Sequence, residues 1–141
     1  MFAEFNYDNF PIVNVRLNNV LDEADFNDFL EKWLKLYLDE KDFVLVFDTL
    51  NVSYVPIKYS IRMAEFIKKL KEQPYHYLQK SIIHVNNNIV KVLLNVIFKL
   101  QSPVAPVYII ENISQLKQIL KDENTDNVIC IMPGKSYIPF L

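Results

Sequence analysis

The sequence predicts an α/β fold with a mostly parallel central sheet of about five to six strands and four helices. In residues 43–48, five apolar residues in a row precede an acid, which is typical of a parallel strand buried on both faces. Residues 81–85 and 107–110 form similar apolar runs. Segments with helical periodicity separate these runs, so we expect parallel strands that are joined by right-handed crossovers.

The amino-terminal part of the chain predicts two paired strands. Residues 2–7 are expected to form a short first strand. In residues 12–17, apolar and polar side chains alternate, which indicates a half-exposed second strand. A turn around Asp8 and Asn9 would make the two strands an antiparallel pair.

The first helix is predicted to begin after Asp22, which is a good N-cap, and to end near residues 39–41. Glu23 and Asp25 place negative charge where the helix dipole favours it. Six apolar residues recur at helical spacing and are expected to form its buried stripe: Phe26, Phe29, Leu30, Trp33, Leu34 and Tyr37.

The second helix is predicted to begin at Pro56 and to stop at Pro74. Its apolar face is expected to contain Ile57, Ile61, Ala64, Ile67 and Leu70, with Met63 and Phe66 widening it.

Residues 86–88 supply a turn and a cap for a third helix over residues 89–100. A short fourth helix is expected to bury Ile113, Leu116, Ile119 and Leu120. The last strand is expected at residues 128–132, and the tail to Leu141 is apolar without periodicity. We expect residues 1–141 to form a single domain.

Composition excludes several classes of protein. A net charge of −2 argues against nucleic-acid binding. The single cysteine, Cys130, excludes an internal disulfide and a cysteine-based zinc site. With Gly134 as the only glycine, no glycine-rich phosphate loop can form. The start of the chain lacks the pattern of a signal peptide, and no apolar segment is long enough for a transmembrane segment, so a cytoplasmic protein is expected. Heavy use of asparagine, lysine and isoleucine is typical of AT-rich genomes, such as those of some giant viruses and protists.

Two motifs resemble a known superfamily. Residues 44–55, VLVFDTLNVSYV, resemble the "VVLDL-x-G-V-x-F-I" strand and loop of STAS domains and CRAL-TRIO (Sec14-like) lipid-binding domains. Residues 73–86, QPYHYLQKSIIHVN, resemble the CRAL-TRIO segment "YPERL-x-K-I-x-I-I-N". The resemblance implies a STAS/CRAL-TRIO-like fold and a binding function. No cofactor is expected.

The chain also departs from both families. Where a regulatory STAS domain has "D-S-S-G" with a phosphorylated serine, this chain has Pro56-Ile57-Lys58-Tyr59, and Ser60 lies within the predicted helix. The "N-A-P" that follows the CRAL-TRIO strand is replaced by residues 86–88, Asn-Asn-Asn. A phosphate switch is therefore not expected, and the chain would be a divergent, minimal member.

The third helix is the most informative segment for function. Only Lys91, Asn95 and Lys99 are polar in it, and their spacing of four places them in one narrow stripe. The rest is apolar nearly all round, so the helix is either core or presents an apolar face to a ligand, membrane or protein partner. Its position matches the helix that gates the lipid cavity in Sec14-like domains. The candidate ligand or partner surface comprises Asp48, Ile89, Val92, Leu93, Val96, Ile97 and Leu100.

Other candidates have simpler explanations. Asp48 ends the central strand, where open α/β sheets bind ligands, but an aspartate there also caps the following loop. His84 is expected to be a core histidine, His76 a loop residue and Cys130 a buried, inert thiol. Lys68, Lys69 and Lys71 complement the dipole of the second helix or bind a phosphate or lipid headgroup.

No nucleophile-base pair and no metal-ligand set is evident, so an enzyme is not expected. The favoured function is protein-protein interaction or a scaffold role. A homodimer that buries the third helix is one form that this function could take. The alternative is a small protein that binds lipid or another apolar ligand, with residues 89–100 as the gate.

Overall fold

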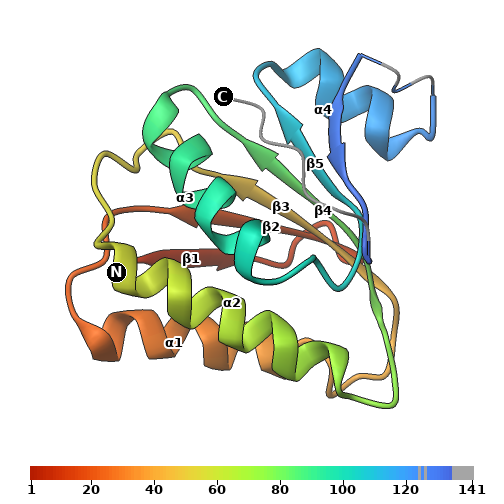
Figure 1. Ribbon diagram of the computed structural model, residues 1–141. Coiled ribbons are helices and arrows are strands. Elements are labelled where there is room, and N and C mark those ends of the chain that lie inside the picture. Colours follow the sequence, from red (N-terminus) through yellow and green to blue (C-terminus); the bar gives the residue numbers. More distant parts are fainter. Residues whose placement is uncertain (124, 126, 135–141) are drawn as a thin grey trace.

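A computed structural model describes residues 1–123, 125 and 127–134 of the chain. One six-stranded sheet has the strand order β1-β2-β3-β4-β5-β6, and four helices accompany it (Figure 1). The strands are β1 (Ala3–Asn6), β2 (Ile12–Leu17), β3 (Phe43–Asp48), β4 (Leu78–His84), β5 (Val107–Ile110) and β6 (Ile129–Ile131). The helices are α1 (Glu23–Lys35), α2 (Ile57–Lys71), α3 (Asn88–Leu100) and α4 (Ile113–Leu120). The predicted fold class is confirmed; the apolar tail lies outside the described residues.

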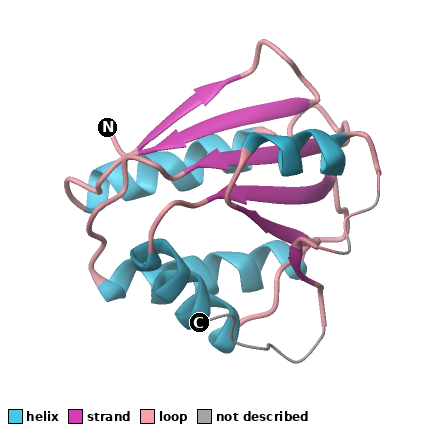
Figure 2. Cartoon of the chain, turned by 90° about the horizontal axis from the view of Figure 1, so that it is seen from above, coloured by secondary structure: helices cyan, strands magenta, loops and turns pink. Residues whose placement is uncertain are grey.

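The sheet is parallel in the middle and antiparallel at both edges. β2, β3, β4 and β5 pair in parallel, whereas β1 pairs antiparallel with β2, and β6 with β5. Figure 2 shows the strands lying side by side in one layer. The predicted antiparallel pair at the amino terminus and the parallel strands that follow it are therefore correct.

The central strand β3 is buried on both faces, as its apolar run predicts. Leu45 and Phe47 belong to the large core under α1, α2 and α3, whereas Val46 belongs to a smaller core under α4. Leu45 is completely buried. This strand requires apolar residues at consecutive positions because helices cover the sheet on its two sides.

The strand order has a consequence for any binding site. Many open α/β sheets bind ligands where the strand order reverses, because the connecting helices there diverge to opposite faces and leave a crevice. Here each parallel strand lies next to the one before it in sequence, so the order never reverses in the parallel part of the sheet. We therefore look for a ligand site between the sheet and the helices that cover it.

Several residues predicted to be buried are exposed. Leu34, Ile57, Ile61 and Ile113 all face solvent, and the side chain of Ile57 is 61% exposed. In α2, the stripe that faces the sheet instead contains Tyr59, Ser60, Ala64, Phe66, Ile67 and Leu70. The apolar pattern predicts the wrong buried face at the start of α2, because it includes two isoleucines that are exposed and omits a tyrosine and a serine that are buried.

Two chemically reactive residues also differ from expectation. Cys130 is exposed on the short strand β6, which is an edge strand among the described residues. His84 is partly exposed at the end of β4, so it is not a core histidine. His76 is exposed in the loop before β4, as predicted.

The polar stripe predicted on α3 does not form one solvated face. Lys91 pairs with Glu111 at 2.6 Å, and Asn95 is buried. Among the described residues, the side-chain oxygen of Asn95 is the one fully buried side-chain nitrogen or oxygen atom without a hydrogen-bond partner. The outward face of α3 is instead apolar.

Candidate ligand-binding cavity

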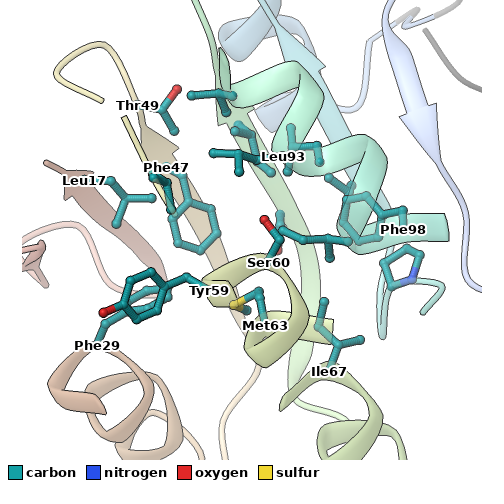
Figure 3. A pocket seen from close by; sticks show the side chains of 18 of the residues that line it. Leu17, Phe29, Phe47, Thr49, Tyr59, Ser60, Met63, Ile67, Leu93 and Phe98 are labelled. Carbon is teal, nitrogen blue, oxygen red and sulfur yellow. The ribbon is translucent and has the colours of Figure 1, made fainter. Parts of the chain in front are cut away.

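A cavity of about 150 Å³ lies between the sheet and the three helices α1, α2 and α3. Figure 3 shows side chains from the strands, α2 and α3 converging on it. Most of the lining is apolar or aromatic, including Phe29, Phe47, Met63, Ile67, Leu93, Leu94, Ile97 and Phe98. The lining is thus dominated by apolar groups, and such a cavity favours apolar occupants.

Aromatic contacts hold the lining of this cavity in place. The ring of Phe26 lies 4.8 Å from that of Tyr59, which joins α1 to α2. Trp33 lies 5.6 Å from Phe47 and therefore joins α1 to the central strand. Such pairs add to the stability gained from burial, and they limit how far the helices can collapse into the space.

Three aliphatic hydroxyl side chains line the otherwise apolar cavity: Thr49, Ser60 and Ser81. The hydroxyl of Thr49 donates a hydrogen bond to the carbonyl oxygen of His84 at 2.7 Å. Ser60 lies on α2, Ser81 lies on β4, and both are buried. In Figure 3 the hydroxyl of Ser60 is directed toward the middle of the lining side chains, whereas that of Tyr59 points away from them.

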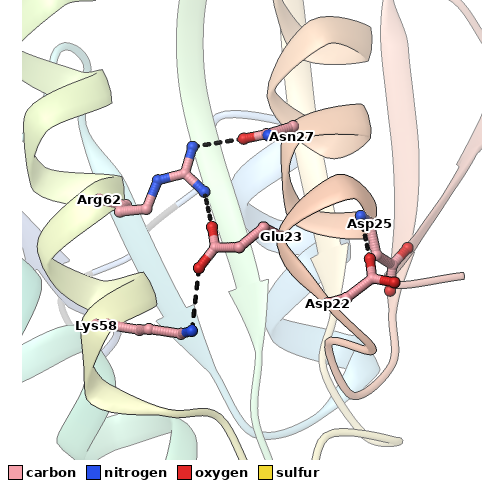
Figure 4. Close-up of polar contacts among 6 residues, drawn as sticks. All are labelled: Asp22, Glu23, Asp25, Asn27, Lys58 and Arg62. Carbon is pink, nitrogen blue, oxygen red and sulfur yellow. Dashed lines mark hydrogen bonds and ion pairs between the residues drawn. The ribbon is translucent and has the colours of Figure 1, made fainter.

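A group of charged residues connects α1 and α2 next to this cavity (Figure 4). Glu23 forms ion pairs with Lys58 at 3.0 Å and with Arg62 at 2.6 Å, and Arg62 also donates to the side chain of Asn27 at 2.5 Å. The hydrogen bond from Lys58 is the main reason why the pKa of Glu23 is lowered. Because these groups are exposed, the cluster orients the two helices more than it stabilises them.

The amino-terminal end of α1 is capped as the sequence predicts. The side chain of Asp22 accepts a hydrogen bond from the backbone N–H of Asp25 at 2.9 Å (Figure 4). Asp25 in turn accepts from the backbone N–H of Phe2 at 2.7 Å. Since Phe2 lines the cavity, this contact also fixes one part of its lining.

Among the residues that the structure describes, those that line the cavity include no carboxylate, lysine, arginine, histidine or cysteine. Within the part of the chain that the structure describes, no three His, Cys, Asp or Glu side chains lie close enough together to hold a metal ion. Although Cys130 is exposed as a residue, partial burial of its thiol raises the pKa of this group, which makes it a weaker nucleophile at neutral pH. The arrangement is suited to binding an uncharged molecule.

The residues predicted on the third helix divide into two sets. Leu93 and Ile97 line the cavity, together with Val90, Leu94 and Phe98. Ile89, Val92 and Leu100 face solvent with exposed fractions of 43%, 48% and 57%, and Val96 is half-buried. The helix therefore presents one apolar face to the cavity and a second apolar face to the outside.

Asp48 does not contribute to this cavity. Its carboxylate accepts a hydrogen bond from the backbone N–H of Leu50 at 2.9 Å, so it caps the loop after β3. It also borders a larger hollow of about 430 Å³ on the other face of the sheet, together with Glu4, Asn6, Asn14 and Arg16. That hollow lies over polar side chains and offers little apolar surface to a ligand, so we favour the smaller cavity.

The three lysines at the end of α2 do not form one patch. Lys68 and Lys69 are exposed, whereas Lys71 is partly buried and its ammonium group contacts the hydroxyl of Ser102. Partial burial lowers the pKa of Lys71. Lys71 is thus engaged within the protein, which leaves two exposed lysines as the remaining part of the predicted headgroup patch.

Sequence reasoning missed most of the cavity lining. The sequence predicts a strand at Phe47 and a helix at Ser60 and Met63, but it gives no indication that these residues surround a space. One signal was available in the sequence. Ser60 is a small polar residue that follows Tyr59, and both lie on the buried side of α2. A buried serine among large apolar residues leaves both a volume and a hydroxyl group.

No helix among the described residues combines the length and the apolar character needed to cross a membrane. Comparison with models of known protein families gives no match for this chain, and no curated protein matches it.

Proposed function

We propose that this protein is a non-enzymatic binding domain that holds a small apolar molecule between its sheet and α2 and α3. The observation that carries the proposal is the cavity of about 150 Å³ with a lining of apolar and aromatic side chains. An apolar cavity of about that volume stays free of water in another protein and binds benzene. This function was the alternative in the sequence analysis, and the cavity now favours it.

The volume limits the size of the ligand. Pockets for drug-sized ligands measure about 300–1,000 Å³. A cavity of about 150 Å³ accepts a molecule of about the size of a substituted benzene ring, but not a complete phospholipid. We therefore propose a small ring or a short aliphatic chain as the ligand, in place of the membrane lipid that the resemblance implies.

The resemblance to STAS and CRAL-TRIO domains remains part of the proposal. It is supported by the order of strands and helices, on which the resemblance partly rests. The proposed cytoplasmic location is supported by the single cysteine, which is typical of proteins from reducing compartments.

Titration with toluene, followed by calorimetry and by the amide and methyl NMR spectra, tests this function. We expect saturable binding, with the largest shifts in the methyl groups of Leu93, Leu94 and Ile97. A ligand at ten times its dissociation constant adds about 1.4 kcal/mol to the free energy of unfolding.

The outer face of α3 provides the matched control. Val92→Ser changes an exposed residue of the same helix and should leave toluene binding unchanged. Absence of saturable binding to the unaltered protein would reject the function, and loss of binding in Val92→Ser would place the ligand on the outside of α3.

Self-association through α3 is the second candidate, because Ile89, Val92 and Leu100 form an exposed apolar stripe. A second copy of the chain would cover this stripe in a homodimer. Size-exclusion chromatography with light scattering tests it: Val92→Asp and Leu100→Asp should each turn a dimer into a monomer. A monomer at all concentrations of the unaltered protein would exclude this candidate. Ile97 is unsuitable for this test because it lines the cavity.

A further inference from the structure

The cavity contains two hydroxyl groups that no other described group engages. Ser60 is 2% exposed and Ser81 is 5% exposed, so both side chains are isolated from bulk water. Within the described residues, neither hydroxyl makes a hydrogen bond to protein, in contrast to the hydroxyl of Thr49, which donates to His84. Both oxygen atoms keep some accessible surface, since neither is among the fully buried side-chain atoms that lack a partner, and both serines line the cavity.

Buried polar groups in folded proteins almost always have a partner, which is protein, water or ligand. The two serines come from different elements, α2 and β4, and both line the same cavity. The hydroxyl of Ser60 is directed into the lining and not toward the backbone of its own helix (Figure 3). The missing partner is therefore expected inside the cavity.

The absence of charge from the lining restricts this partner further. No lysine, arginine or histidine of the described part of the chain lines the cavity, so a carboxylate or phosphate there would meet no counter-charge from it. A buried ion without a counter-charge is strongly disfavoured. A hydroxyl group, by contrast, both donates and accepts, so it can bond to an uncharged hydroxyl or carbonyl group.

We propose that Ser60 and Ser81 select an uncharged ligand that carries one hydrogen-bonding group on an apolar body, such as a phenol or a short-chain alcohol. This inference rests on the proposed function and specifies the ligand of the same cavity. The apolar body would contact Phe47, Leu93 and Ile97, and the polar group would bond to the serine hydroxyls. A water molecule on the two serines is the competing occupant.

Three probes of similar shape test the proposal: phenol, toluene and benzoate. We expect phenol and toluene to bind to the unaltered protein and benzoate not to bind. In Ser60→Ala, Ser81→Ala and the double variant, phenol should bind more weakly, by about three- to tenfold in the double variant, because a hydrogen bond is lost. Toluene binding should stay the same or become tighter.

Ser114→Ala is the matched control, because it removes the hydroxyl of an exposed serine on α4 that does not line the cavity. It should leave the ratio of the phenol and toluene dissociation constants unchanged. Thermal unfolding and circular dichroism establish that each variant is folded. Removal of a hydroxyl without a protein partner should not lower the melting temperature.

The outcomes separate this inference from the function on which it rests. If toluene binds and the serine variants weaken phenol and toluene equally, or neither, the hydroxyl groups do not select the ligand. Binding of toluene without phenol also overturns the inference, since a retained water then occupies the serines. If neither probe binds, the proposed function itself fails. Tight binding of benzoate would contradict the uncharged ligand class.

Discussion

Ser60→Leu should fill part of the cavity and raise the stability of the protein. Ser60 lies on α2 with its hydroxyl directed into the cavity, so a leucine side chain at this position would extend into the same space (Figure 3). Burial of each additional methylene group contributes about 0.8 kcal/mol. Beyond Cβ, leucine has about three carbon atoms where serine has a hydroxyl oxygen, so the gain from burial is about 2.4 kcal/mol at most.

The empty space gives a second estimate of the same effect. At about 24 cal/mol per Å³, a cavity of about 150 Å³ costs about 3.6 kcal/mol relative to a filled core. Leucine fills only part of it, and imperfect packing reduces the gain. We therefore expect the free energy of unfolding to rise by about 1–2 kcal/mol, and the melting temperature by about 3–8 °C.

Urea denaturation and differential scanning calorimetry measure this change, and toluene titration measures the accompanying loss of binding. Glu65→Leu is the matched control, because Glu65 is exposed on the same helix and leucine there fills no cavity. Its effect should stay within about 0.5 kcal/mol. A fall in stability of Ser60→Leu by more than about 1 kcal/mol would show that the core around Ser60 is already filled.

Three further predictions concern the surroundings of the cavity. The pKa of Glu23 should lie below 4.5 in an NMR titration and should rise toward that value in Lys58→Ala. The stabilisation from ionised Glu23 is present above its unfolded pKa and is lost as the pH falls through its folded pKa. An unshifted pKa of Glu23 in the unaltered protein would refute this prediction. Asn95→Leu should raise the free energy of unfolding by about 1–2 kcal/mol in urea denaturation, because it removes a buried oxygen without a partner, and destabilisation would mean that this oxygen has one. Asp22→Ala should lower it by about 1 kcal/mol and Asp22→Asn by much less, since an asparagine oxygen still caps α1; equal losses would show that charge, not the cap, is responsible.

The middle of the sheet could be predicted from the sequence because its parallel strands consist mostly of consecutive apolar residues. The run at residues 43–48 requires two covered faces, and the structure has them. The caps of α1 and α3 were also predictable, since Asp22 and Asn87 each accept hydrogen bonds from backbone N–H groups of the next turn.

The cavity could not be predicted in the same way. Periodicity indicates which side chains face the core, but not whether their volumes fill it. The orientation of α2 shows the limit: Ile57 and Ile61 fit the apolar pattern, yet Tyr59 and Ser60 occupy the buried positions. The sequence also could not show which face of α3 is covered, because this helix is apolar nearly all round.

A crystal structure of the protein under xenon pressure tests the central claim most directly, because xenon enters apolar cavities without requiring a polar partner. We predict a bound xenon atom between Phe47, Leu93 and Ile97, inside the cavity that α2 and α3 form with the sheet. Side chains that fill this space and exclude xenon would contradict the claim.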